Sequence, residues 1–475
     1  LTVAAANGVA EFADLSITET GSFGLNAAAA GLAGTGPADV FIRPGPLDRL
    51  TVVANPDTVA AGSRVDITVS AYDAFDNVKT DYVGTPNFRS SDAAATLPGP
   101  YTYYETDNGV HTYRAAFIPR TRGDQTITAW DNGVYSAPET VTVTNSPPGA
   151  PLLVSPTDGG FAGLAPVLAA SPFEDEDDTG QAGSHFQVAT DSDFVFVVWD
   201  SGELGPFSST VVPAGALAEY TLYYWRVRYR DDSGDPGTEW SNWSAFSQFR
   251  TGYSLPFSDP FSEDRGWQGL RAGGWAIGPA AEGGGEYGFP DPAEDTSATD
   301  DNRLLGYNIG GDYGEMTDEF VTSPPFDCSG EDTVELTFQR WLGVEGNDWG
   351  HASIEVSSDG VEWHEIWGNP QTDTEDSQWW RMMYDISPWA ANEPTVFVRF
   401  RMGPMNAAYP FCGWNIDDLE VTAAAEALAE IILEVREDKI EVGDLFHLDI
   451  YVQENSPEAA GMMGAGVDVD FPDAL

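Results

Sequence analysis

The chain has 475 residues, with 76 acidic residues against 21 basic ones and a net charge of −55. A chain of this length is too long to fold around a single hydrophobic core, so we expect about three to five domains. A surface of this charge repels nucleic acid and anionic lipid, and no run of about 18 apolar residues is present to span a membrane. Composition therefore argues against nucleic-acid binding and membrane insertion.

Short alternating runs such as Val-x-Val and Thr-x-Thr are separated by turn residues, which include 50 Gly and 32 Pro. This pattern predicts an all-β fold made of several β-sandwich modules. Clusters of Pro and Gly interrupt it and mark linkers. They divide the chain into five segments: 1–44, 45–145, 146–252, 253–424 and 425–475. The outer two are too short for complete sandwiches.

The acidic surface suits a protein that works outside the cell in salt or calcium, although simple solubility would also explain it. Two cysteines, Cys328 and Cys412, fall within one segment. In a secreted protein such a pair suggests a disulfide, whereas a cytosolic protein would more often keep two buried thiols. The composition leads us to expect an extracellular or cell-surface location.

The segment 45–145 contains the runs "SAYDAFDNVKTDYVG", "SSDAAATLP" and "DNGVHT". In these runs it resembles the bacterial immunoglobulin-like repeats found in tandem on cell-surface proteins. The resemblance implies a β-sandwich that serves as a spacer or adhesive stalk. Asp73, Asp76 and Asn77 could form a metal loop, but we expect a hydrogen-bonded turn.

The segment 146–252 contains "YYWRVRYR", in which alternate residues face opposite sides of a strand. One side carries Trp225, Val227 and Tyr229, and the other carries Arg226, Arg228 and Arg230. The later run Trp240-Ser-Asn-Trp243-Ser resembles the Trp-Ser-x-Trp-Ser element of fibronectin type III domains in cytokine receptors. The resemblance implies a structural ladder in which Trp240 and Trp243 stack between these arginines.

The segment 253–424 is rich in tryptophan and contains "SSDGVEW", "FDCSG" and "FCGWNIDDLEV". These runs resemble the MAM-like jelly-roll modules appended to secreted bacterial peptidases and surface proteins. The resemblance implies a disulfide between Cys328 and Cys412 on adjacent strands. It also implies a structural calcium ion, for which oxygen ligands in loops are suited. The candidate ligands are Asp291, Asp295, Asp300, Asp301, Asp417 and Asp418. The run "FEDEDDTG" at 173–180 is a second calcium candidate or a solvated loop.

Signatures of catalysis are missing from the sequence. His364-Glu365 begins like a zinc-peptidase motif but has no second histidine four positions on. No nucleophile elbow, phosphate-binding loop or Cys/His metal spacing occurs. We therefore expect a protein that is not an enzyme. Exposed indoles could bind glycans, although most should fill cores; of Trp379 and Trp380, one should face outward.

The two ends look like parts of domains. "NGVAEF" near the start parallels "NGVHTY" inside the immunoglobulin-like segment, so 1–44 is predicted to be the second half of such a domain. The run "EVGDLFHLDIYV" makes 425–475 resemble the opening half of a cohesin-like or immunoglobulin-like domain. Either the chain is an excerpt of a longer modular protein, or complementary halves pair between neighbouring copies.

These observations favour a non-catalytic, extracellular structural or adhesive protein of a cell surface, surface layer or filament. The alternative is an accessory region of a large secreted hydrolase that binds carbohydrate or protein. The expected partners are neighbouring copies of itself, flanking domains of the same chain, and glycans, with calcium as the structural cofactor.

Overall fold

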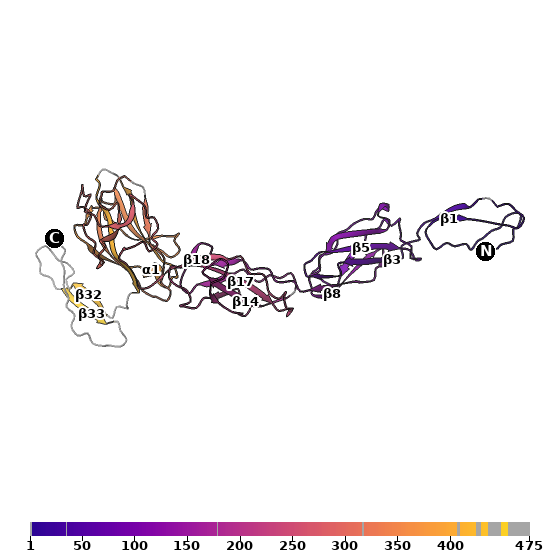
Figure 1. The fold of residues 1–475 in the computed structure, drawn as a ribbon, viewed down its shortest axis with the longest axis horizontal. Coiled ribbons are helices and arrows are strands. Elements are labelled where there is room, and N and C mark those ends of the chain that lie inside the picture. Colours follow the sequence, from indigo (N-terminus) through magenta and orange to yellow (C-terminus); the bar gives the residue numbers. More distant parts are fainter. Residues whose placement is uncertain are drawn as a thin grey trace.

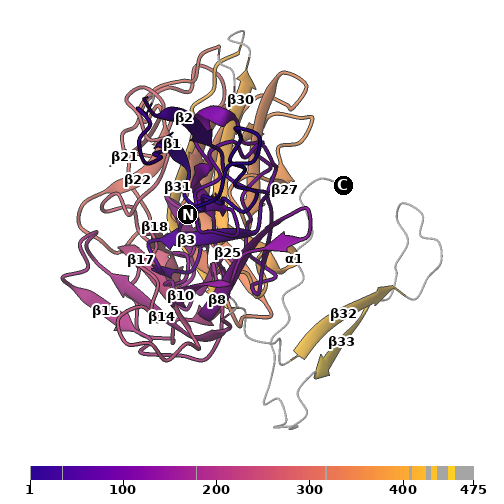
Figure 2. The same ribbon diagram turned by 90° about the vertical axis from the view of Figure 1, so that its right-hand side faces the viewer.

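The computed structural model describes residues 2–34, 36–177, 179–315, 318–405, 409–423, 429–435 and 448–454. Within these ranges the chain is a row of β bodies, with the N-terminal hairpin at one end (Figure 1). Seen from that end, the bodies lie behind one another, apart from β32 and β33 (Figure 2). The all-β prediction is confirmed. None of the helices found in these ranges is long and apolar enough to cross a membrane.

The immunoglobulin-like domain is a sandwich of two sheets that follow from its alternating sequence. In "VDITVSAY", every second side chain is buried in the core. One sheet has the order β3-β5-β7, and the other has the order β4-β10-β8-β6, with β9 paired to β8. The elements are β3 (Arg49–Asn55), β4 (Thr58–Ala60), β5 (Val65–Tyr72), β6 (Asn87–Ser90), the 3₁₀ helix η1 (Glu105–Asp107), β7 (Val110–Phe117), β8 (Gly123–Asp131), β9 (Val134–Tyr135) and β10 (Glu139–Thr144).

The next domain is also a two-sheet sandwich, with strand orders β11-β13-β16 and β12-β18-β17-β14-β15. Its longest strand, β17, buries Trp225, Val227 and Tyr229 completely, as the alternation predicts. The strands are β11 (Leu153–Ser155), β12 (Gly160–Ala162), β13 (Val167–Ala170), β14 (Gln181–Ala189), β15 (Val197–Asp200), β16 (Ser209–Val211), β17 (Leu222–Asp231) and β18 (Ser247–Thr251).

The largest body is a jelly-roll sandwich whose core includes Trp275, Phe338 and Trp414. One sheet has the order β21-β22-β31-β25-β28, with β20 on β31 and β29 on β25; the facing sheet has the order β23-β30-β26-β27. The first half comprises β19 (Tyr253–Ser254), β20 (Phe257–Asp259), β21 (Trp275–Pro279), β22 (Arg303–Tyr307), β23 (Glu319–Thr322), β24 (Phe326–Asp327) and β25 (Val334–Val344). The second half comprises β26 (Gly350–Ser357), β27 (His364–Gly368), β28 (Thr374–Glu375), β29 (Trp380–Asp385), α1 (Ser387–Ala390), β30 (Phe397–Met405) and β31 (Gly413–Ala423).

Each end of the described chain carries an antiparallel two-stranded sheet. At the N-terminal end β1 (Gly21–Leu25) pairs with β2 (Ala38–Ile42). At the other end β32 (Ala429–Val435) pairs with β33 (Leu448–Glu454). The remainder of the predicted C-terminal half-domain, at 425–428, 436–447 and 455–475, lies outside the described residues.

The disulfide predicted between Cys328 and Cys412 is wrong, because both residues are free, buried thiols. Cys328 lies just before the turn that leads into β25 at Val334, whereas Gly413, next to Cys412, pairs with Gly343 near the far end of that strand. The strand from Val334 to Gly343 spans about 30 Å. A disulfide needs Cα atoms within about 7 Å of each other, so the two thiols lie too far apart.

Candidate functional site

The arginines on the outer face of β17 form a stacked ladder with two tryptophans. The Arg226 guanidinium lies 4.3 Å from the Trp243 ring centroid, and Arg228 lies 4.5 Å from the centroids of both Trp240 and Trp243. Arg230 lies 5.9 Å from Trp240. The structure therefore brings all five predicted residues together. The ladder arises because β17 alternates core and surface residues, which puts the three arginines on its outer face. The segment that carries Trp240 and Trp243 then runs beside β17, where Trp240 bridges to Arg230.

Polar neighbours complete the ladder. Arg226 also lies 4.1 Å from the ring of Phe194, and its Nε donates to Gln187 Oε1 at 3.0 Å. Arg230 Nε donates to Glu203 Oε1 at 2.9 Å. Burial lowers the pKa values of Arg226 and Arg228 from their usual range; the charge of Arg228 adds to the shift at Arg226, and the charge of Asp200 opposes the shift at both. These contacts make the ladder a self-contained structural feature.

The six predicted calcium ligands do not form one group. Asp417 and Asp418 meet the loop before β22, where Thr296 Oγ1 donates to Asp417 Oδ2 at 3.0 Å and to Asp418 Oδ2 at 2.9 Å. Ser297 Oγ in turn donates to Asp295 Oδ2 at 3.0 Å. Ser297 N also donates to Asp417 Oδ2 at 3.0 Å, so Thr296 and Ser297 join these three carboxylates into one cluster, which we call the Asp417 cluster.

The other three predicted ligands lie elsewhere or at the margin. Asp301 reaches the Asp417 cluster only through the hydroxyl of Thr299, at 2.8 Å, and Asp300 is exposed. Asp291 is buried and accepts hydrogen bonds from Asn415 Nδ2 at 2.5 Å and Gly310 N at 2.8 Å. In the described ranges, no three carboxylate, imidazole or thiolate groups form a metal-binding group.

Burial controls the charge state of the two deepest carboxyls. It raises the pKa of Asp291 to about 7, although hydrogen bonds from Asn415 and Gly310 oppose the shift. It raises the pKa of Asp417 to about 6, and the neighbouring Asp418 charge acts in the same direction. Asp417 Oδ1 and Asn415 Oδ1 are buried acceptors without a hydrogen-bond donor. Both groups therefore leave oxygen lone pairs unsatisfied beneath the loop at 291–302 that precedes β22, which we call the acidic loop.

The tryptophan pair at the start of β29, Trp379 just before the strand and Trp380 within it, has one exposed member, as predicted. Trp380 is 48 % exposed. Trp379 instead donates from Nε1 to the Glu294 carbonyl at 3.1 Å and lies edge-on to Trp341 at 5.9 Å between centroids. Trp379 therefore holds the acidic loop in place, and Trp380 is the indole available to a partner.

A second guanidinium–aromatic stack lies on the facing sheet of the jelly roll and was missed by the sequence analysis. The Arg399 guanidinium lies between the rings of Phe320, at 4.2 Å, and Trp363, at 3.9 Å. Its Nε donates to Glu355 Oε2 at 2.6 Å. The signal was present in "FVRFR", which alternates arginine with core residues as β17 does.

The loop at Asp73 forms the expected hydrogen-bonded turn. Asp73 Oδ1 accepts from the backbone N–H groups of Phe75 at 2.9 Å and Asn77 at 3.0 Å. Asp73 Oδ2 also accepts from Gly45 N at 2.9 Å, which anchors the incoming linker. Burial alone would raise the pKa of Asp73, but these hydrogen bonds outweigh it and lower the pKa to about 2.

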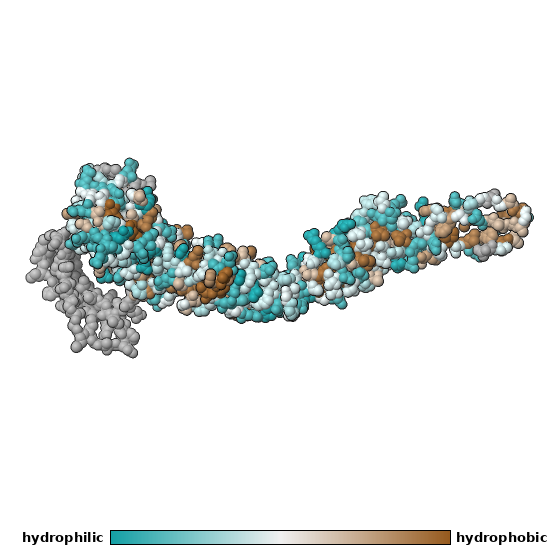
Figure 3. Space-filling view, viewed as in Figure 1, coloured by the Kyte–Doolittle hydropathy of each residue, from teal (hydrophilic) through white to brown (hydrophobic). Residues whose placement is uncertain are grey.

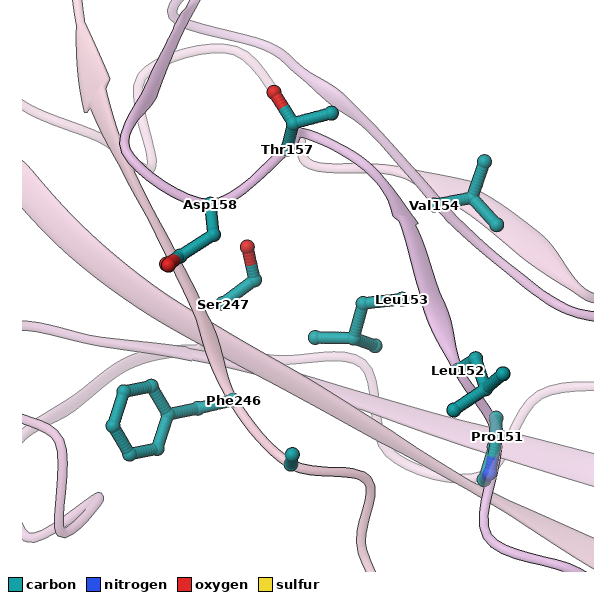
Figure 4. A pocket seen from close by; sticks show the side chains of 9 residues that line it. Pro151, Leu152, Leu153, Val154, Thr157, Asp158, Phe246 and Ser247 are labelled. Atoms are coloured by element: carbon teal, nitrogen blue, oxygen red, sulfur yellow. The ribbon is translucent and has the colours of Figure 1, made fainter.

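An apolar groove of 280 Å³ lies on the side of the domain at 146–252 (Figure 4). Leu152, Leu153 and Val154 line it on one side and Phe246 on the other. Asp158 is the one titratable side chain among its lining residues. The groove therefore offers apolar contact and no paired acid and base.

Comparisons with known proteins agree with a modular β-sandwich protein. The family described as "Rha78A-like, N-terminal immunoglobulin domain" matches residues 170–254. No curated protein sequence matches the chain.

Solved structures give partial matches. An α-L-rhamnosidase from Dictyoglumus thermophilum matches over 65 % of this chain and 29 % of its own, with 13 % identity and a TM-score of 0.21. The CBM22-1 xylan-binding domain of Paenibacillus barcinonensis Xyn10C matches over 36 % of this chain and 94 % of its own, with 13 % identity and a TM-score of 0.23. Fibronectin(III)-like modules of Clostridium thermocellum CbhA match over 42 % of this chain and 93 % of their own, with 14 % identity and a TM-score of 0.16. The chain thus spans less than a third of the rhamnosidase, and all three TM-scores are too low for a common overall arrangement.

Proposed function

We propose that the chain is a non-catalytic, extracellular string of modules that holds its jelly roll at a fixed position. The observation that carries this proposal is how the jelly roll joins the domain before it. Leu164 N donates to Asp327 Oδ2 at 2.5 Å, and Phe161 contacts Phe397 edge-on at 5.5 Å between centroids. Tyr220 also stacks on Tyr253 across this junction, and Ser254 N donates to Glu219 Oε1 at 3.2 Å.

Such a junction suits a structural or adhesive protein of a cell surface, surface layer or filament. Direct hydrogen bonds and aromatic contacts fix the relative orientation of two domains better than a flexible linker does. The partners would be neighbouring copies of the chain or flanking domains. Sedimentation of the purified chain tests self-association: concentration-dependent assembly supports this function, and a monomer at all concentrations argues against pairing between copies.

The second candidate function is an accessory region of a secreted hydrolase. The match of residues 170–254 to a rhamnosidase-type immunoglobulin domain favours it. In this case Trp380 would stack on a sugar ring, because exposed indoles present a flat apolar face. Affinity electrophoresis in soluble polysaccharides tests it: retardation that is lost in W380A but kept in W349A, another exposed indole, supports glycan binding. Hydrolysis of any polysaccharide by the purified chain would contradict the non-catalytic assignment.

We also propose that the Asp417 cluster binds a structural calcium ion. Two observations support the fit: Asp417 Oδ1 is buried without a donor, and the Asp417 and Asp418 carboxylates lie side by side on the hydroxyl of Thr296. Asp417 and Asp418 would hold the ion together with neutral oxygen atoms, since no three carboxylates of the described ranges form a metal-binding group, and the ion would supply positive charge to neutralise the pair. The residues themselves already fasten the acidic loop to β31.

Differential scanning calorimetry with calcium, magnesium or chelator tests this site. Calcium in the millimolar range, typical of extracellular modules, should raise the melting temperature of the jelly roll. The variant D417N should lose this rise, whereas D300N, at an exposed position, should keep it. A rise that persists in D417N would place the ion elsewhere.

A further inference from the structure

The junction between the immunoglobulin-like domain and the domain at 146–252 is held by charged groups. Arg120 forms an ion pair with Glu176, and Arg122 Nη2 lies 2.9 Å from Asp235 Oδ2. These side chains are 33 to 59 % exposed. Ion pairs that face water are weakened by salt, because mobile ions screen them.

The two arginines are held in position by their own domain. Asp92 Oδ2 accepts hydrogen bonds from the backbone N–H groups of Arg120, at 2.6 Å, and Thr121, at 3.0 Å. Asp92 is itself buried. The turn that carries Arg120 and Arg122 is therefore part of the rigid domain, and the arginine side chains reach across the junction from it.

The linker between the domains is fixed at one buried point. Asn145 Nδ2 donates to Asp231 Oδ2 at 3.0 Å, and Ser146 N donates to Asp177 Oδ2 at 3.0 Å. Asn145 is 3 % exposed and Asp231 is fully buried. Salt screens buried contacts much less than exposed ones, so the Asn145–Asp231 hydrogen bond should remain at high salt, when the ion pairs have opened.

A polar cavity lies beside the ion pairs. It measures 570 Å³ and is lined by Arg120 together with Glu174, Asp175, Glu176 and Asp177. Figure 3 shows a hydrophilic surface where these two domains meet. The junction with the jelly roll differs, because aromatic rings pack across it, including Tyr220 stacked on Tyr253 at 5.1 Å between centroids.

We propose that this first junction is a hinge controlled by ionic strength. At low salt Arg120, paired with Glu176, and Arg122, paired with Asp235, hold the immunoglobulin-like domain at one angle. At high salt the ion pairs open and the domain swings about the Asn145–Asp231 contact. The domain at 146–252 and the jelly roll move together as one body. This inference holds for either proposed function, since it concerns only the angle between modules.

Distances between spin labels on the full chain test the hinge. One label pair, T106C with S192C, spans the hinge, and a second pair, S192C with T372C, spans the jelly-roll junction; all three positions are exposed. The two native cysteines are fully buried and should not take label. Raising salt from about 10 mM to about 1 M shortens the Debye length from about 30 Å to about 3 Å and should broaden the first distance distribution at least about twofold. The second distribution should stay unchanged.

Charge variants separate the ion pairs from general effects of salt. R120E/R122E should give the broad first distribution already at low salt, and adding E176R/D235R should restore the narrow one. The control R89E/R114E makes the same change in net charge elsewhere on the domain and should leave the distribution narrow. A melting curve for each variant checks that it is folded. The proposal would be overturned if the distance distribution between T106C and S192C stayed the same at high salt and in R120E/R122E. It would also be overturned if the distribution between S192C and T372C broadened equally.

Discussion

Replacing Trp243 by alanine should destabilise the domain at 146–252 more than any replacement of an exposed tryptophan. The Trp243 ring contacts the guanidinium groups of Arg226 at 4.3 Å and Arg228 at 4.5 Å. Partly desolvated contacts of this kind are each worth about 1 kcal/mol. The loss of the half-buried indole surface adds about 1–2 kcal/mol. We therefore expect a total loss of about 3–4 kcal/mol in the free energy of unfolding.

Differential scanning calorimetry of the full chain measures this loss. For a domain of this size, about 1 kcal/mol corresponds to roughly 4–8 °C, so W243A should lower the transition of this domain by roughly 10 °C or more. R228K keeps the charge but loses the planar group, and should cause about half the shift. W380A, at a 48 % exposed position in the jelly roll, is the matched control and should move its own transition little. Equal shifts in W243A and W380A would refute the reasoning that stacking between arginines stabilises this domain.

Three further predictions follow from the jelly roll and its junction. Burial raises the pKa of Asp291 to about 7 from 3.8, so the folded state holds a proton that the unfolded state releases, and stability should fall as pH rises from about 4 to about 7. Calorimetry across this range should show a flatter profile for D291N; an unchanged profile would mean that Asp291 does not titrate as argued. Cys328 and Cys412 are fully buried, so a thiol reagent should label neither in the native chain and both after unfolding, and reductant should not change the melting temperature. Because Phe161 contacts a jelly-roll ring across the junction, F161A should separate the melting transitions of the two domains; a single unchanged transition would show that other contacts couple them.

Some features of this protein follow from local sequence alone. Alternation of apolar and polar residues predicted the β class, and the "VDITVSAY" and "YYWRVRYR" runs bury the residues that alternation assigns to the core. Alternation also placed Arg226, Arg228 and Arg230 on one face of a strand, where the structure shows them against Trp240 and Trp243. Both are local properties, because neighbouring residues of a strand must face opposite sides.

Other features depended on which strands become neighbours. The sequence pairs Cys328 with Cys412 by resemblance, but sheet register puts them near opposite ends of β25. Asp291 likewise accepts a hydrogen bond from Asn415, two positions before Asp417 on β31, and so stays outside the Asp417 cluster, although it shares a loop with Asp295. The contacts of Arg120 and Arg122 join residues more than 50 positions apart. Such contacts are set by long-range strand pairing and domain packing, which no local periodicity in the chain encodes.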